Sequence, residues 1–244
     1  MPTSKPTVVL VHGAWHDERC WADVMSQLSL RRTPSVCLTL PSTDPGRELP
    51  GFADDVAAVT DLIDAVDGEV TLCGHSYGGM VISEAGNHDR VTRLVYLAAY
   101  CPRPGERVVD QSAGIVSPLA VPAVRQTGDG RMMIRARPAA RRLYGDLRGP
   151  VASRKAAQLL PSTAAIYRAP ATNPAWRSTP TTYVVCRRDR ALNSRRSRDT
   201  AHRIVRSQLA LGLNSSRAVS INTGHSPFYS APNLVADVLV RSAR

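Results

Sequence analysis

The sequence predicts an α/β fold built on a mostly parallel, doubly wound sheet, with a small helical insertion after the fourth strand. Strand-like and helix-like runs alternate along the chain, which is the pattern of βαβ units. The strand-like runs are continuously apolar, as expected for strands that are buried on both faces. The alternation stops after Pro102 and resumes at Thr181. We therefore expect a single domain over residues 1–244, with an inserted cap or lid at residues 103–170.

The first elements follow from local spacing. Residues 7–11 are apolar and rich in β-branched side chains, which predicts a strand, and a turn at 12–15 follows it. Apolar residues spaced by three and four predict a helix at 20–28. Residues 36–40 are expected to form a second strand that ends at Pro41.

The next elements surround a glycine-rich turn. A stripe of apolar residues predicts a helix at 52–66, and strands are expected at 70–73 and 91–99. Between these two strands lie the turn at 74–79 and a short helix at 80–85. This order of strand, turn and helix places the turn at the edge of the sheet.

Residues 103–170 contain stretches rich in proline, glycine and arginine and no convincing strand. Helices are expected there at 137–147 and 151–160. Such a segment would lie over the carboxyl ends of the strands, where open α/β sheets bind their ligands. The alternating pattern then resumes with a strand, a helix, a strand and a helix, at residues 181–186, 196–211, 217–221 and 232–240.

Composition narrows the class of protein. The 244 residues are 43% hydrophobic, which is typical of globular domains. No apolar run approaches the roughly 18 residues of a membrane span, so we expect no membrane partner. The start of the chain does not resemble a secretory signal, which favours a cytoplasmic location. Five cysteines without a C-x-x-C pair are interpreted as buried structural thiols.

The charge is large and uneven. The chain carries a net charge of +11, with an acidic first part (residues 1–102) and a basic second part (residues 103–244). The basic residues are almost all arginines, they are scattered, and no nucleic-acid-binding motif accompanies them, so we expect no nucleic-acid partner. The excess of arginine over lysine resembles the composition of GC-rich bacterial genomes.

The strongest signal for chemistry is Gly74-His75-Ser76-Tyr77-Gly78, a G-x-S-x-G pattern directly after an expected strand and before an expected helix. In that context the pattern is a nucleophile elbow, which raises a serine hydroxyl above the edge of the sheet. The flanking glycines provide the space that a sharp turn needs. The alternative is a glycine-rich connection with an incidental serine.

With this motif the sequence resembles the α/β-hydrolase superfamily, in particular the small-cap serine esterases that include plant methylesterases, hydroxynitrile lyases and bacterial relatives. The resemblance covers essentially the whole chain, most loosely in the insertion. It implies the α/β-hydrolase fold and a triad in the chain order serine, acid, histidine. It implies no metal and no organic cofactor.

Two further residues complete the expected triad. A serine hydroxyl needs a base within hydrogen-bond reach, and only His225 follows the last expected strand, in a Gly-His loop that matches the superfamily. Asp189 follows the preceding strand by three residues and is the only acid between Asp146 and Asp199. We expect Ser76, Asp189 and His225 to form the catalytic set. The alternatives are a surface histidine and an ion pair of Asp189 with its neighbouring arginines.

By the same resemblance, the backbone N–H groups of Ala14 and Tyr77 would form an oxyanion hole. His12 would orient the first loop rather than react. The expected substrate-binding residues are Gly13, Trp15, His16, Met132 and Tyr144. The insertion carries many arginines, and one or two of them facing the cleft would favour an anionic or carboxylated substrate.

The expected activity is that of a carboxylesterase-like serine hydrolase (class EC 3.1.1), which cleaves a small-molecule ester or lactone through an acyl-enzyme. One alternative is acid/base chemistry on the same triad without hydrolysis, in a lyase or a cyclase of natural products. The lyases of this group use a lysine of the cap, and only Lys155 is available here. A ligand receptor without activity is a further alternative. The protein is expected to be a monomer or a homodimer.

Overall fold

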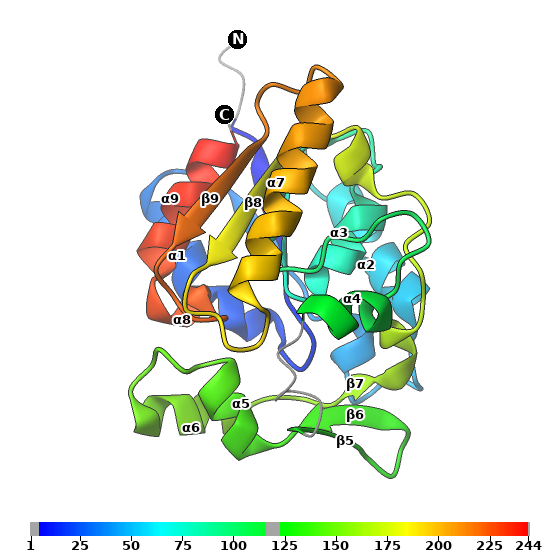
Figure 1. Cartoon of the computed structure of the whole chain (residues 1–244), viewed down its shortest axis with the longest axis vertical. Coiled ribbons are helices and arrows are strands. Elements are labelled where there is room, and N and C mark those ends of the chain that lie inside the picture. The colour runs from blue at the N-terminus through cyan, green and yellow to red at the C-terminus, as the bar shows by residue number, and fades with distance from the viewer. Residues whose placement is uncertain (1–4, 116–122, 244) are drawn as a thin grey trace.

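The computed structural model describes residues 5–115 and 123–243. Six parallel strands form the central sheet, in the order β2-β1-β3-β4-β8-β9 (Figure 1). Their bounds are β1 Thr7–Val11, β2 Ser35–Cys37, β3 Val70–His75, β4 Val91–Leu97, β8 Thr181–Cys186 and β9 Arg217–Ile221. The predicted parallel sheet is confirmed.

Helices cover both faces of the sheet, which makes the fold doubly wound (Figure 1). One face is covered by α1 (Ala22–Leu30) and α9 (Pro232–Ser242), and the other by α2 (Phe52–Asp64), α3 (Gly78–Ala85) and α7 (Ser194–Ala210). The short helical segments of this region are η1 Glu18–Trp21, η2 Pro41–Thr43, η5 Ala175–Arg177 and α8 Pro227–Ser230.

The strand β1 explains why the apolar runs are continuous. Side chains alternate between the two faces of a strand. Val8 and Leu10 pack in the core beneath α1 and α9, whereas Val9 and Val11 pack in the core beneath α2 and α3. Because both faces are covered, every position of the strand is apolar.

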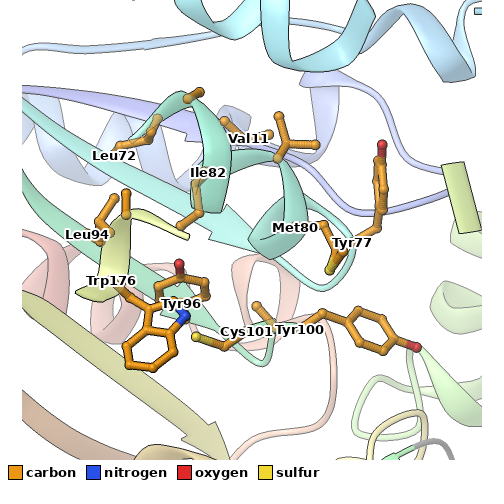
Figure 2. Packing of buried hydrophobic residues seen from close by; sticks show 14 of the residues in the cluster. Val11, Leu72, Tyr77, Met80, Ile82, Leu94, Tyr96, Tyr100, Cys101 and Trp176 are labelled. Atoms are coloured by element: carbon orange, nitrogen blue, oxygen red, sulfur yellow. The ribbon is translucent and has the colours of Figure 1, made fainter. Parts of the chain in front are cut away.

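Figure 2 shows part of the second of these cores, around α3. Ile82 of the helix lies near Leu72 of β3 and Leu94 of β4, Met80 lies beside Tyr77, and all five side chains are buried. The five cysteines are free. Four of them are buried, as the sequence predicted, whereas Cys37 is only half-buried. Among the described residues, no helix has both the length and the apolar character needed to cross a membrane.

The inserted segment differs from the expectation. The prediction that residues 103–170 contain no strand is wrong, because a three-stranded antiparallel sheet lies there. Its strands have only two to four residues, too few to display a period of two. The two predicted helices are present as α5 and α6. The bounds are α4 Val108–Ile115, β5 Val124–Gln126, β6 Arg131–Ile134, α5 Ala136–Arg142, α6 Gly149–Ala157, β7 Ser162–Thr163 and η4 Ala164–Tyr167.

The small sheet and the helices α5 and α6 lie beyond the carboxyl ends of the central strands, as expected for this segment (Figure 1). Residues 116–122 of the predicted cap lie outside the described part of the chain. Arg131 of β6 fastens the segment to the loop that follows β2. Its guanidinium is buried and donates hydrogen bonds to the carbonyl oxygens of Ser42, Asp44 and Arg47.

Candidate active site

The order of the strands marks the place where a ligand would bind. Strand β1 lies between β2 and β3, so the chain runs toward one edge of the sheet after β1 and toward the other edge after β3. In an open α/β sheet, the loops diverge at such a reversal and leave a crevice for ligands. The loop at 12–16 follows β1, and Ser76 follows β3. Both predicted site segments therefore meet at this position.

Ser76 occupies a strained turn between β3 and α3. Its φ angle is 50°, in the left-handed region that non-glycine residues rarely adopt. Three backbone hydrogen bonds hold this turn: the Ser76 amide donates to Leu97 (3.3 Å), and its carbonyl oxygen accepts from Gly79 (3.0 Å) and Tyr100 (3.1 Å). Such a turn is the geometry of the predicted elbow.

The glycines of the motif are required by close contacts. A Cβ atom on Gly78 would lie 2.7 Å from the carbonyl oxygens of both Val11 and His12, and one on Gly74 would collide with the backbone of Gly78. Real Cβ atoms do not approach backbone this closely, so larger residues would displace the elbow from β1. The prediction that these glycines provide space is confirmed.

Asp189 and His225 form a buried pair. The His225 Nδ1 atom lies 2.7 Å from Asp189 Oδ2, and each side chain is only 2% exposed. The other carboxylate oxygen, Oδ1, accepts hydrogen bonds from the amides of Ala191 and Leu192, both at 2.8 Å. The alternative of a surface ion pair with the neighbouring arginines is therefore wrong. Since Oδ2 faces Nδ1, the hydrogen bond favours the tautomer with the proton on Nδ1 and a lone pair on Nε2.

Ser76 and His225 line one cavity of about 480 Å³. That volume suits a small organic molecule. The wall on the side of the sheet includes Ala14, Trp15, His16, Tyr100 and Leu192. The wall on the side of the insertion includes Val109, Val124, Met132, Ile134, Arg142, Leu143, Tyr167 and Arg168. Most of these side chains are apolar, so the cavity offers a largely apolar surface around Ser76 and His225.

Two backbone amides close to Ser76 in the structure have no acceptor among the described residues. In the described part of the chain, neither the amide of Ala14 nor that of Tyr77 makes a hydrogen bond. Ala14 lines the cavity directly, and Tyr77 begins the first turn after the nucleophile elbow. Unpaired N–H groups away from water are costly, and they become favourable only when an acceptor is bound beside them.

Tyr77 is held from the opposite side. Its hydroxyl donates a 2.7 Å hydrogen bond to Asp55 Oδ2, and Asp55 Oδ1 accepts from the amide of Ser42 at 2.8 Å. Asp55 is fully buried. Burial disfavours its charged form and raises the pKa of this carboxyl to about 6. The hydroxyl of Tyr77 is therefore occupied away from the cavity.

Three buried histidines support the site without a charge. His12 accepts the Leu40 amide on Nε2 (2.9 Å) and contacts the Gly13 carbonyl through Nδ1 (2.8 Å). Burial lowers the pKa of His12 to about 4 and that of His16 to about 3, because desolvation disfavours the imidazolium. Burial also lowers the pKa of His75, whose Nε2 atom lies 3.0 Å from the carbonyl oxygen of His225.

Each of these histidines makes a hydrogen-bond contact with a backbone atom of a loop at the site. His12 fastens the first loop, as the sequence suggested, and His75 fastens the loop that carries His225. Within residues 5–115 and 123–243, no three His, Cys, Asp or Glu side chains form a group suited to a metal ion.

The expected substrate-binding residues separate into two groups. Trp15, His16 and Met132 line the cavity. Gly13 lies beneath it instead, where an added Cβ would be 2.8 Å from the Cβ of Ser76. Tyr144 is buried behind His16 and its hydroxyl lies 2.9 Å from His16 Nε2. Gly13 and Tyr144 were expected to contact the substrate, but neither is among the described residues that line this cavity.

The sequence matches the model of the alpha/beta hydrolase family over residues 8–238. The chain belongs to this family.

Known proteins agree with that assignment. A probable hydrolase from the fungus Phoma sp. is 28% identical over 98% of this chain and 99% of its own length. A carbendazim-hydrolysing esterase from Nocardioides sp. is 34% identical over 41% of this chain and 45% of its own. The crystal structure of a methylesterase protein from Arabidopsis covers 97% of this chain and 98% of its own, with a TM-score of 0.76 and 20% identity. The resemblance to the α/β-hydrolase superfamily and its esterases is thus confirmed.

This hydrolase also has site residues that the sequence reasoning missed. Asp146 of the insertion accepts the amide of Gly224 on Oδ2 at 2.6 Å, directly beside His225. An added Cβ on Gly224 would lie 2.5 Å from Asp146 Oδ1. The sequence held one weak signal for this contact, the glycine before His225, and none for its partner.

Proposed function

We propose that this protein is a serine hydrolase that cleaves a carboxylic ester or a lactone through Ser76, Asp189 and His225. One observation carries the proposal: the buried Asp189–His225 pair and the strained serine of the elbow open onto the same cavity. The hydrolase and esterase names of the relatives support the same class of reaction. We assign it to the carboxylesterase-like enzymes.

The first step is acylation of the serine. His225 Nε2 takes the proton of the Ser76 hydroxyl as the oxygen attacks the acyl carbonyl of the substrate. The carboxylate of Asp189 keeps the proton of the imidazole on Nδ1 and stabilises the imidazolium that forms. The two amides that Asp189 also binds, those of Ala191 and Leu192, fix the orientation of the carboxylate.

The negative charge of the tetrahedral intermediate falls on the former carbonyl oxygen. We assign its stabilisation to the amides of Ala14 and Tyr77, because both lack another acceptor among the described residues. Hydrogen-bond donors that are already oriented need no rearrangement in the transition state. The contacts of His12 and the Tyr77 hydroxyl keep these two segments in place.

The second half of the reaction releases both products. Protonated His225 gives its proton to the leaving alcohol, and the same nitrogen then activates a water molecule that attacks the acyl-enzyme. Ser76 and the neutral imidazole are regenerated. The reaction requires no metal and no organic cofactor, and its partner is a small molecule rather than a macromolecule.

We assign the role of a cap to residues 103–170. Residues of this segment line the same cavity as Ser76 and His225, so they would exclude water and contact the substrate. The proposed enzyme is a single domain, a monomer or homodimer, acting in a bacterial cytoplasm.

The lyase alternative has less support. Its relatives use a lysine of the cap near the reactive groups, whereas Lys155 does not line the cavity and places its ammonium 4.1 Å from the ring centroid of Tyr229. A complete triad also argues against a receptor without activity. A non-hydrolytic cyclase on the same three residues remains the second candidate, because acid/base chemistry uses the same Asp189–His225 pair.

The test is hydrolysis of p-nitrophenyl acetate and p-nitrophenyl butyrate by the wild type, by Ser76→Ala and by Ser153→Ala. Ser153 is exposed on α6 and does not line the cavity, so it is the matched control. We expect turnover by the wild type and the control and none above background by Ser76→Ala. Turnover that survives in Ser76→Ala would contradict the proposal, and no turnover by the wild type would favour the non-hydrolytic candidate.

A further inference from the structure

Two arginines of the insertion, Arg142 at the end of α5 and Arg168 after η4, line the cavity that holds Ser76. The other described residues of that lining are apolar or uncharged, except for the titratable imidazoles of His16 and His225. No Asp and no Glu is among the described lining residues. In the described part of the chain, the lining therefore has two cationic residues and no carboxylate to balance them.

Among the described residues, the guanidinium groups of Arg142 and Arg168 make no hydrogen bond and no ion pair. Other arginines of the insertion differ in this respect: Arg107 pairs with Asp110 at 2.7 Å, and Arg131 binds three carbonyl oxygens. Residues 116–122, which lie outside the described part, contain no acidic residue that might supply a partner.

Arg142 is also half-buried. Desolvation without a counter-ion lowers the pKa of its guanidinium, although arginine keeps its charge at neutral pH. A partly desolvated cation without a partner is unfavourable, and an anion bound in the cavity would remove that cost. The guanidinium offers planar, paired N–H groups that match a carboxylate.

We infer that the natural substrate is an ester or lactone that carries a carboxylate, which Arg142 binds with the help of Arg168. This inference rests on the proposed function, because it assigns the specificity of the same cavity. Ser76 and His225 belong to the α/β region, and the two arginines belong to the insertion. The carboxylate and the reacting acyl group would thus contact different segments of the chain.

The apolar part of the lining restricts the substrate further. Val109, Val124, Met132 and Leu143 lie among the cavity residues, so the rest of the substrate molecule is expected to be hydrocarbon or aromatic. Small hydrophilic acids would gain little from this surface.

The experiment compares matched esters. The first pair is mono-p-nitrophenyl adipate and its isostere in which an isopropyl group replaces the carboxylate. The second pair is p-acetoxybenzoate and its methyl ester, which places the charge on the alcohol side. The readout is the ratio of kcat/KM for the anionic ester to that for the neutral one. It is measured for the wild type, Arg142→Gln, Arg142→Lys, Arg168→Gln and Arg154→Gln.

We expect Arg142→Gln to lower this ratio by roughly tenfold to a hundredfold for at least one pair, as for a lost hydrogen bond to a charged group. Arg142→Lys should restore part of it, and Arg168→Gln should lower it less. Arg154 is exposed on α6 and does not line the cavity, so Arg154→Gln should leave the ratio unchanged. Added salt should reduce the ratio of the wild type.

Failure of the inference differs from failure of the proposed function. Equal ratios in the wild type and Arg142→Gln for both pairs, with turnover still dependent on Ser76, would overturn the inference alone. If no ester is cleaved, calorimetric binding of hexanoate and hexanamide decides. Weaker binding of hexanoate alone in Arg142→Gln would support the anion site, and equal binding in both proteins would overturn it.

Discussion

Two regions of the molecule line the same cavity, and they differ in charge and in the residues that they supply to it. The α/β region (residues 5–102 and 171–243) provides Ser76, His225 and Asp189, all held by buried hydrogen bonds. The insertion (residues 103–170) provides apolar residues and two arginines whose guanidinium groups have no partner among the described residues. The proposed reactive groups are thus held by the α/β region, whereas the proposed anion site lies in a segment whose strands have only two to four residues.

The insertion nevertheless holds the loops of the α/β region. The indole of Trp15 donates to the carbonyl of Met132 (3.1 Å), and the carbonyl of Trp15 accepts from the amide of Leu160 (2.8 Å). Asp146 binds the amide of Gly224. Both loops that the mechanism uses, one after β1 and one before α8, therefore have a contact from the insertion. The two regions differ in chemistry but are mechanically connected.

The largest effect should come from the reactive groups of the α/β region. Ser76→Ala and His225→Ala should each lower kcat for p-nitrophenyl butyrate by about 10³- to 10⁶-fold, and the double variant should lose no more than either single variant, because the residues act as one unit. Steady-state kinetics with far-ultraviolet circular dichroism as a folding control measures this. If the losses of kcat in the two single variants add up in the double variant, the two residues act independently, which would contradict this prediction.

Asp189→Asn should lower kcat by about 10²- to 10⁴-fold. The side-chain oxygen of the asparagine would accept the amides of Ala191 and Leu192, as Oδ1 does now. The NH₂ group would then face His225 Nδ1 and favour the tautomer with the proton on Nε2, which cannot accept the serine proton. The pH profile of kcat distinguishes this from loss of folding. A change of less than threefold would contradict the assigned role.

Acid should destabilise the α/β region through its buried histidines. The pKa of His12 is lowered to about 4 and that of His16 to about 3, against about 6.5 in the unfolded chain. Their contribution to the free energy of unfolding is therefore fully present above pH 6.5 and is lost as the pH falls toward 4. The loss approaches about 1.4 kcal/mol per pH unit for each histidine. The insertion contains no histidine.

Asp55 acts in the opposite direction. Its pKa is raised to about 6, so its ionised form weakens the fold above its unfolded pKa, and protonation below pH 6 returns stability. Urea unfolding at pH 7, 6 and 5 should show a falling free energy of unfolding, with a steeper fall in Asp55→Asn. A free energy that stays constant between pH 7 and pH 5 would contradict this account.

The smallest effect tests the connection between the regions. Asp146→Ala should lower kcat by about tenfold and change KM little, because Gly224 would lose its acceptor and His225 its fixed position. Asp110→Ala, at an exposed ion pair of the insertion, is the matched control. If Asp146→Ala and Asp110→Ala have the same kcat, the insertion does not position the histidine.

The sequence was sufficient to predict the strands whose side chains are apolar along a continuous run. The strands at 7–11, 181–186 and 217–221 have the bounds expected from their apolar runs. The elbow was predictable because its glycines and its place between strand and helix are local features. Asp189 and His225 could be proposed because each follows the end of an expected strand. That they form a pair was implied only by the resemblance to the superfamily.

The strands and contacts of the insertion were harder to predict than those of the α/β region, for physical reasons. Its strands are too short for a visible period. Contacts such as Asp146–Gly224 join residues 78 positions apart, and no local spacing indicates them. Arg142 is one of many arginines in the segment, and only the cavity distinguishes it. Tyr144 was expected at the substrate as a candidate for the apolar face of the lid, yet its hydroxyl lies 2.9 Å from Nε2 of buried His16.

The central claim is that Ser76 is a nucleophile activated by His225. The most direct measurement is the intact mass of the protein after treatment with an alkyl fluorophosphonate, followed by peptide mapping, for the wild type, Ser76→Ala and His225→Ala. We expect one adduct on the wild type, located at Ser76, much slower labelling of His225→Ala and no adduct on Ser76→Ala. An unlabelled wild type, or an adduct at another residue, would contradict the claim.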